Sequence, residues 1–132
     1  MNLSATTPAT PRQVATAGLK AAFGILDKWG CSPLQAQKIL RISKPAYYKY
    51  RTHPEMASLD SDQLDRISYL LNIHAALRTI FDNPENVYGF MGMANDNPYF
   101  NGAAPLDLIG TGQFAALYET FKRIDALRGG LW

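Results

Sequence analysis

The chain has 132 residues, of which 47% are hydrophobic, so it can bury a core but is too short for two full-sized independent domains. No apolar run approaches the roughly 20 residues that a membrane span requires, and we expect no membrane partner. The single cysteine, Cys31, cannot form an internal disulfide and has no Cys or His at metal-ligand spacing. These features exclude a disulfide scaffold and a structural zinc site.

The net charge of +2 is distributed unevenly along the chain. Residues 1–51 carry eight basic side chains and one acidic side chain, a net charge of +7, whereas residues 52–132 carry five basic and ten acidic side chains, a net charge of −5. A strongly basic segment attracts polyanions through its electrostatic field. The first part of the chain is therefore expected to bind nucleic acid.

The first ten residues are expected to form a flexible leader, because MNLSATTPAT lacks the basic start and the apolar stretch of a secretory signal. The first predicted helix begins after Thr10, with Pro11 at its first position and Gln13 as the capping-box partner, and it ends at Gly30. Helical spacing predicts that this helix buries the stripe Val14, Gly18, Ala21, Ala22, Ile25 and Trp29.

Two short helices around a tight turn then predict a helix-turn-helix. The first of them is capped by Ser32 with Gln35 as its partner, residues 42–45 interrupt it, and the second runs from Pro45 to Arg51. In this motif the second helix enters the major groove of DNA. The candidate DNA-binding residues are Lys38, Arg41, Ser43, Lys44, Tyr47, Tyr48, Lys49 and Arg51. The alternative is that this basic face is only solvated surface and that the helix pair is a plain packing unit.

A long central helix is predicted after a connector, with Asp60 as its cap and Gln63 as the partner. A further helix begins at Asn83-Pro84, with Met91 and Met93 filling gaps in the core, and a last helix covers roughly residues 113–128 after Thr111 as a cap. No strand is predicted, so the fold class is all-α. The expected organisation is a leader (1–10), a helix-turn-helix lobe (11–58), the central helix (59–83) and a C-terminal lobe (84–132).

Two patterns that resemble catalytic or cofactor motifs are better explained by structure. Residues 110–115 match the dinucleotide fingerprint G-x-G-x-x-A, but only seventeen residues follow, too few for the second strand and the acidic ribose ligand. His74 falls on the apolar face of the long helix, where a hydrogen-bonded structural histidine is more common than a catalytic base. We therefore expect no enzyme activity, no catalytic residue, no metal and no cofactor.

The chain ends with two glycines followed by Leu131 and Trp132. A large aromatic side chain on a flexible tether is typical of a tip that docks into a partner. The alternative is that Trp132 folds back onto the core of its own chain. Physical reasoning gives both interpretations equal weight.

The last third of the chain combines an Asn-Gly turn, a Pro-Leu pair, an apolar stretch closed by Thr-Gly, an Arg-Ile pair in an amphipathic helix and a late glycine. The residues concerned are Asn101, Gly102, Pro105, Leu106, Thr111, Gly112, Arg123, Ile124 and Gly129. This pattern resembles the toxin-binding domain of the Xre/MbcA/ParS antitoxins, with ParS members as the nearest likeness. The helix-turn-helix and the long helix that follows it resemble the Xre-like front half of the same antitoxins.

The resemblance implies a partner toxin of the RES type, an NAD-consuming or ADP-ribosylating enzyme whose active site is blocked by the C-terminal segment. The toxin-binding residues that it implies are Asn101, Gly102, Pro105, Arg123, Arg128, Gly129, Gly130, Leu131 and Trp132. It also implies a cytoplasmic homodimer that binds operator DNA and autoregulates its own transcription. The alternative function is a stand-alone helix-turn-helix repressor whose C-terminal half only dimerises.

Overall fold

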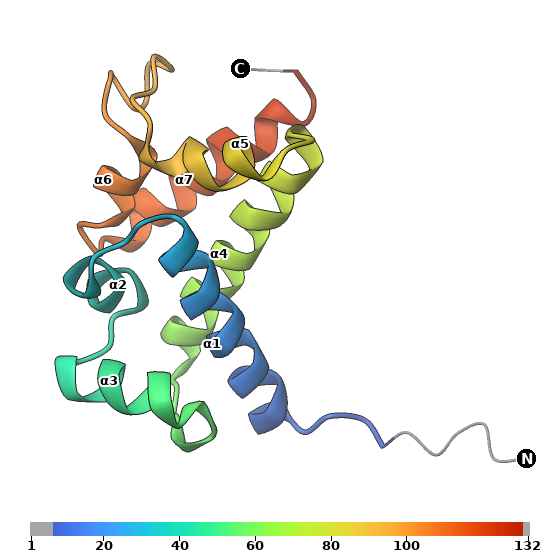
Figure 1. The fold of residues 1–132 in the computed structure, drawn as a ribbon, viewed down its shortest axis with the longest axis vertical. Helices are drawn as coiled ribbons and strands as arrows, with labels where there is room; N and C mark the ends of the chain where they lie inside the picture. Colours follow the sequence, from blue (N-terminus) through green and yellow to red (C-terminus); the bar gives the residue numbers. More distant parts are fainter. Residues whose placement is uncertain (1–6, 131–132) are drawn as a thin grey trace, which may run out of the picture.

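The computed structural model describes residues 7–130, and this range contains helices and turns but no strand, as the sequence predicts (Figure 1). The elements are, in chain order, α1 (Pro11–Lys28), α2 (Pro33–Leu40), α3 (Lys44–Thr52), η1 (Pro54–Met56), α4 (Ser61–Ile80), α5 (Pro84–Gly89), η2 (Phe90–Gly92), α6 (Pro105–Ile109) and α7 (Phe114–Leu127). No helix in the described part of the chain has the length and hydropathy that crossing a membrane requires.

Capping boxes begin three of the helices, as the sequence predicts. The side chains of Thr10, Ser32 and Asp60 accept hydrogen bonds from backbone N–H groups three residues later, in α1, α2 and α4. In each case a glutamine side chain accepts a hydrogen bond from the cap residue's own backbone N–H in return. Each cap stabilises its helix by roughly 1 kcal/mol, because it satisfies backbone donors that the helix leaves unpaired.

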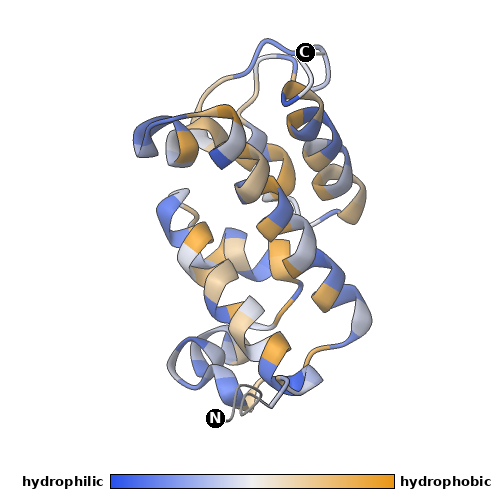
Figure 2. Cartoon of the chain, turned by 90° about the vertical axis from the view of Figure 1, so that its right-hand side faces the viewer, coloured by the Kyte–Doolittle hydropathy of each residue, from blue (hydrophilic) through white to orange (hydrophobic). Residues whose placement is uncertain are grey.

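The long helix α4 forms the centre of the molecule, and both α1 and α7 pack against it. Figure 2 shows that hydrophobic and hydrophilic residues share each of these helices, which is the pattern of helices buried on one side. The largest completely buried side chains come mainly from α1, α2, α4, α6 and α7 and include Leu19, Leu26, Ile39, Leu40, Leu70, Ile73, Leu77, Met91, Ile109, Leu117 and Ile124. One continuous core therefore joins both ends of the chain.

The buried face of α1 agrees in part with the predicted stripe, since Ala22, Ile25 and Trp29 are buried. Val14 is 60% exposed and Ala21 is also exposed, whereas Leu19, Phe23 and Leu26 are buried. The predicted stripe has correct helical spacing, but α1 contacts η1 as well as α4, and Phe23 meets Tyr47 of α3. Spacing alone cannot show that α1 has neighbours on two sides.

The C-terminal part contains a helix, α6, that the sequence analysis treats only as an apolar stretch. The N-cap position of α7 is Gln113, which makes no side-chain capping bond, rather than the predicted Thr111. The Thr111 hydroxyl donates to the carbonyl of Leu108 at 2.8 Å and accepts from the backbone N–H of Gln113 at 3.3 Å. Met91 is fully buried as predicted, but Met93 is 55% exposed, so it does not fill a gap in the core. The turns around α6 are set by its packing on α7 and η2, which the local sequence does not specify.

Candidate functional site

The predicted helix-turn-helix is present, with α2 and α3 joined by residues 41–43. Arg41 ends α2 in the left-handed conformation, with φ of 56°, and Ser43 caps α3 by accepting from the backbone N–H of Ala46 at 3.2 Å. Pro45 lies in the first turn of α3, where its missing N–H costs no hydrogen bond. The sharp change of direction therefore follows from one left-handed residue and one capped helix start.

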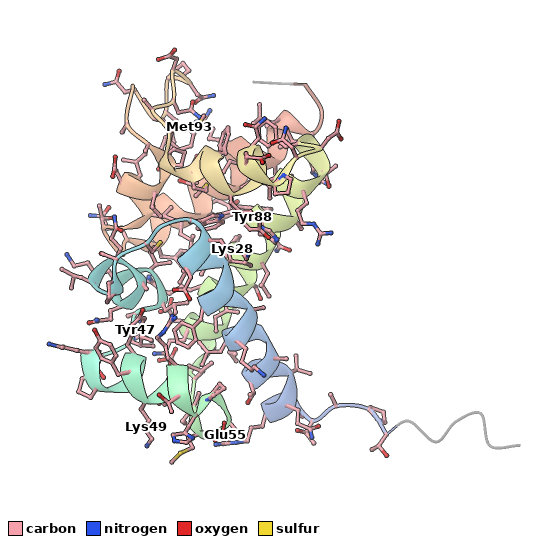
Figure 3. All side chains as sticks on the ribbon, viewed as in Figure 1. Lys28, Tyr47, Lys49, Glu55, Tyr88 and Met93 are labelled. Atoms are coloured by element: carbon pink, nitrogen blue, oxygen red, sulfur yellow. The ribbon has the colours of Figure 1, made fainter. Side chains whose placement is uncertain are left out.

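The side chains of α3 divide between the core and the surface. Tyr48 is 50% exposed, and Lys44 and Lys49 are also exposed, so these three lie on the outer face. Tyr47 is only 5% exposed and meets the ring of Phe23 edge-on, with the ring centroids 5.7 Å apart. In Figure 3, Tyr47 lies on the side of α3 that faces α2, and Lys49 lies on the opposite side. Tyr47 is therefore a core residue and does not belong to the predicted DNA-contacting face.

Both predicted DNA-binding arginines are held by carboxylates. The guanidinium of Arg51 pairs with Asp27 at 2.6 Å and lies over the rings of Phe23 and Tyr47. The guanidinium of Arg41 bridges Asp60 and Asp62, the latter at 2.5 Å. The hydrogen bonds from Arg41 lower the pKa of both carboxyl groups, and the hydrogen bond to Asp27 raises the pKa of Arg51.

These pairings change how charge is distributed over the helix-turn-helix. The sequence count of +7 for residues 1–51 does not include the acidic residues that α4 brings back to α2. Within residues 7–130, no ion pair involves Lys38, Lys44 or Lys49. These three lysines are therefore the basic side chains of α2 and α3 whose charge no carboxylate in the described residues offsets.

A buried arginine that the sequence analysis did not select lies where the two halves of the chain meet. Arg66 of α4 is 6% exposed and pairs with Asp62 at 3.0 Å. Its Nη1 donates to the carbonyl of Ile39 at 3.2 Å and to that of Gly112 at 2.8 Å. In the sequence Arg66 stands four residues after Asp62, which is the spacing of an ordinary ion pair on a helix surface. No sequence signal therefore indicates that Arg66 is buried.

A groove on the surface begins at the same place. It is lined by residues of α2, of the helix-turn-helix turn and of the turn between α6 and α7: Leu34, Gln37, Lys38, Arg41, Ile42, Ser43, Lys44, Thr111 and Gly112. Four of the predicted DNA-binding residues therefore share one depression with two residues of the C-terminal half. The linear sequence separates these two groups by more than sixty residues.

The predicted Asn-Gly turn is a left-handed corner. Asn101 has φ of 50° and Gly102 has φ of 87°, conformations that few residues other than Asn and Gly adopt readily. The backbone N–H of Gly102 donates to the carbonyl of Asn95 at 2.8 Å, which closes the loop. Both residues are exposed, whereas Pro105 is buried at the start of α6. Pro105 therefore positions α6 and offers little surface to a partner.

The other predicted toxin-binding residues lie on α7 and just after it. Arg123 contacts Glu119 at 3.7 Å and lies over the ring of Tyr99, while Arg128 pairs with Asp125 at 2.7 Å. Gly129 and Gly130 follow directly, and Gly130 has φ of 73°, which allows the chain to leave the helix axis. Leu131 and Trp132 lie outside the described residues.

An aromatic cluster joins α4 to α7 and is partly exposed. The ring of Tyr69 meets Phe114, Tyr118 and Phe121 edge-on, with centroid separations of 5.6, 5.6 and 5.4 Å. Tyr118 is 38% exposed, and the ammonium of Lys122 lies 5.4 Å from the centre of its ring. The cluster fixes α7 on α4 and presents aromatic edges beside a positive charge, a combination that suits protein contacts.

The remaining reactive side chains have structural roles. Burial raises the pKa of the Cys31 thiol to about 12, so the thiol stays protonated and is a poor nucleophile. His74 stacks on Tyr88 with centroids 5.4 Å apart, and burial lowers its pKa. Its Nδ1 is buried without a hydrogen-bond partner in the part that the structure describes, so the predicted hydrogen bond at this atom is replaced by stacking. That part of the chain also contains no group of three or more His, Cys, Asp or Glu residues placed to bind a metal.

Comparison with protein families assigns both halves of the chain. The family model of the antitoxin Xre-like helix-turn-helix domain matches residues 9–72, and that of the antitoxin Xre/MbcA/ParS C-terminal toxin-binding domain matches residues 76–130. The chain belongs to the Xre/MbcA/ParS antitoxins. Among curated proteins the antitoxin is similar to the uncharacterized protein y4oB of Sinorhizobium fredii (strain NBRC 101917 / NGR234), with 30% identity over 124 residues, 93% of each chain.

The two family matches meet inside α4, between residues 72 and 76. The helix-turn-helix match therefore includes Arg66, and the toxin-binding match includes Gly112, to which Arg66 donates a hydrogen bond. Neither family is a known enzyme family. The antitoxin thus carries a helix-turn-helix domain and a toxin-binding domain on one shared helix.

Proposed function

We propose that this antitoxin neutralises a RES-type toxin, which consumes NAD or transfers ADP-ribose, by placing its C-terminal segment in the toxin's active site. The match of residues 76–130 to the toxin-binding domain carries this proposal. The geometry around Gly130 supports it, because Gly130 lies just after α7 in the left-handed conformation, with φ of 73°, which does not continue the helix. The exposed aromatic cluster of α4 and α7 supplies a surface on which the body of the toxin can rest.

The decisive experiment removes Gly129 to Trp132 and compares this variant with one that lacks residues 1–6, a deletion of similar size at the other end. Both are co-expressed with a RES-type toxin, and cell survival is measured. The C-terminal deletion should abolish protection and leave the thermal unfolding midpoint unchanged, whereas the N-terminal deletion should protect fully. Full protection by both variants would contradict the blocking mechanism.

The same proposal includes binding of α2 and α3 to the antitoxin's own promoter, which would make the protein an autoregulator in the cytoplasm. The exposed residues Lys44, Tyr48 and Lys49 of α3, together with Lys38 of α2, support it, because lysines and tyrosine hydroxyls contact phosphates. Arg41, Ser43 and Arg51 lie at the edge of this face and hold the protein backbone of α2 and α3 in position.

We also place the homodimer contact on α1 and α4. These helices form an apolar surface groove lined by Ala9, Pro11, Val14, Ala15, Gly18, Leu64, Ile67, Ser68 and Leu71. Val14 and Leu64 are large hydrophobic residues that are 60% and 39% exposed. A groove without charged side chains and with small residues at its floor allows two helices to approach closely, as a symmetric contact between copies requires.

The second candidate is a stand-alone repressor whose C-terminal half only dimerises. The helix-turn-helix favours the repressor and the DNA-binding antitoxin equally. A stand-alone repressor, however, gives no role to a domain that matches a toxin-binding family. Co-purification distinguishes the two functions: a complex with the product of the neighbouring gene supports neutralisation, and an antitoxin that purifies alone from co-expressing cells supports the repressor.

A further inference from the structure

Arg66 connects the two halves of the molecule through one guanidinium group. Its Nη1 donates to the carbonyl of Ile39 at the end of α2 and to the carbonyl of Gly112 in the turn between α6 and α7. Its Nε donates to Asp62 at 3.0 Å, and Asp62 also accepts from Nε of Arg41 at 2.5 Å. A continuous series of hydrogen bonds therefore runs from the toxin-binding half to the turn of the helix-turn-helix.

The backbone at Gly112 is held unusually close to α2. A Cβ atom at this position would lie 2.9 Å from the carbonyl oxygen of Lys38, and φ is +84°, so only glycine fits. A Cβ atom built on the neighbouring Gly110 would lie 3.3 Å from Nε2 of Gln35, which is also in α2. The turn between α6 and α7 is thus packed directly on the helix that precedes the DNA-contacting helix.

Arg66 is also the only buried charged side chain in the range 7–130. Burying a guanidinium is unfavourable unless its hydrogen bonds are satisfied, so the group must keep its partners on both sides. A displacement of Gly112 therefore either breaks one of these bonds or moves the end of α2. The end of α2 carries the left-handed Arg41, which sets the direction in which α3 begins.

We propose that Arg66 couples the two binding surfaces, so that a toxin bound to the C-terminal half changes the affinity of the helix-turn-helix for DNA through the bonds from Arg66 to Ile39 and Gly112. This inference rests on the proposed function, because it requires one protein to bind both DNA and toxin. Coupling between two sites is reciprocal, so DNA changes the affinity for toxin by the same factor.

The test measures the dissociation constant of the antitoxin for a duplex that carries its own promoter, with and without a saturating amount of a catalytically inactive RES-type toxin. Wild-type protein is compared with Arg66→Met, which retains an unbranched apolar stem, and with Arg78→Met, an exposed arginine on the same helix. Toxin should change the wild-type and Arg78→Met constants at least fivefold, in the range typical of coupled sites. It should change the Arg66→Met constant less than twofold.

A milder variant covers the case in which Arg66→Met does not fold. Arg66→Lys keeps the charge, but a single ammonium cannot reproduce the planar set of donors that reaches Asp62 and two carbonyls together, so the coupling factor should also fall below twofold. Circular dichroism and the thermal midpoint identify which variant is folded.

Three results would overturn the inference. The first is the same toxin-dependent factor in the folded Arg66 variant as in the wild type. The second is a wild-type protein that binds promoter DNA equally well with and without toxin, which leaves the proposed function intact. The third is a wild-type protein that shifts no promoter fragment even at low salt, which removes the DNA part of the proposed function as well.

Discussion

The basic residues of the helix-turn-helix differ in what their charges contact. Arg41 and Arg51 use their planar guanidinium groups to hold carboxylates of α4 and α1, a geometry that lysine cannot reproduce. Lysine is a compact charge on a flexible stem, and Lys44 and Lys49 extend from the exposed face of α3. The arginines therefore stabilise the position of the two helices, and the lysines supply charge for a polyanion.

We predict that Lys44→Ala combined with Lys49→Ala weakens promoter binding and reduces its salt dependence. Each lost phosphate contact lowers the slope of log K against log salt by about 1, so the double variant should lose a slope of about 2. The measurement is fluorescence anisotropy of a labelled promoter duplex at several salt concentrations. Lys122→Ala, an exposed lysine on α7, is the matched control and should keep the wild-type slope. An equal slope in both variants would place the DNA contact elsewhere.

The end of α2 meets the start of α4, and Asp60 has two functions at this junction. Asp60 caps α4 and also accepts from Arg41, whose own carbonyl accepts from the side chain of Gln63 at 2.9 Å. The capping box that the sequence predicts is thus also a tertiary contact. The cap that begins α4 therefore also fixes the end of α2.

This junction predicts an acid-dependent loss of stability. The pKa values of Asp60 and Asp62 are lowered in the folded protein, mainly by hydrogen bonds from Arg41, whereas the unfolded chain binds protons near the ordinary value of 3.8. Their stabilising effect is present above that value and is lost as pH falls through the lower folded pKa values. Arg41→Met should therefore lose less stability between pH 5 and pH 3 than the wild type does.

The comparison uses urea unfolding at pH 5 and pH 3, at low ionic strength because these side chains are about half exposed and salt screens them. Lys20→Met, which removes an exposed charge from α1, serves as the control and should follow the wild type. Parallel pH dependence in Arg41→Met and the wild type would contradict the assignment.

At the scale of the whole molecule, α4 is the common support of both halves. It packs against α1, α2 and α7, and the buried residues of all four helices belong to one core cluster, so neither half has a separate core. The outer side of the α1 and α4 pair is left with an apolar groove. Both the coupling through Arg66 and the proposed dimer follow from this arrangement.

We predict that Val14→Glu combined with Leu64→Glu converts a homodimer into a monomer. Both side chains are exposed in the single chain, so the charges are tolerated there but repel their copies across a symmetric contact. Light scattering after size exclusion gives the mass. Met93→Glu, at an exposed position in the loop after η2, is the control and should remain dimeric. A monomeric wild-type protein would contradict the dimer itself.

The sequence by itself determined the helical class, the three capping boxes, the helix-turn-helix and the family, because caps, prolines and hydrophobic spacing act over a few residues. It did not determine that Tyr47 is buried or that Arg41 and Arg51 are paired, since both outcomes depend on residues brought from α1 and α4. Only the tertiary structure placed Gly112 against the end of α2 and buried Arg66 between them. Such contacts join positions far apart in the chain, and burial depends on which surfaces meet, so periodicity within one helix carries no information about them.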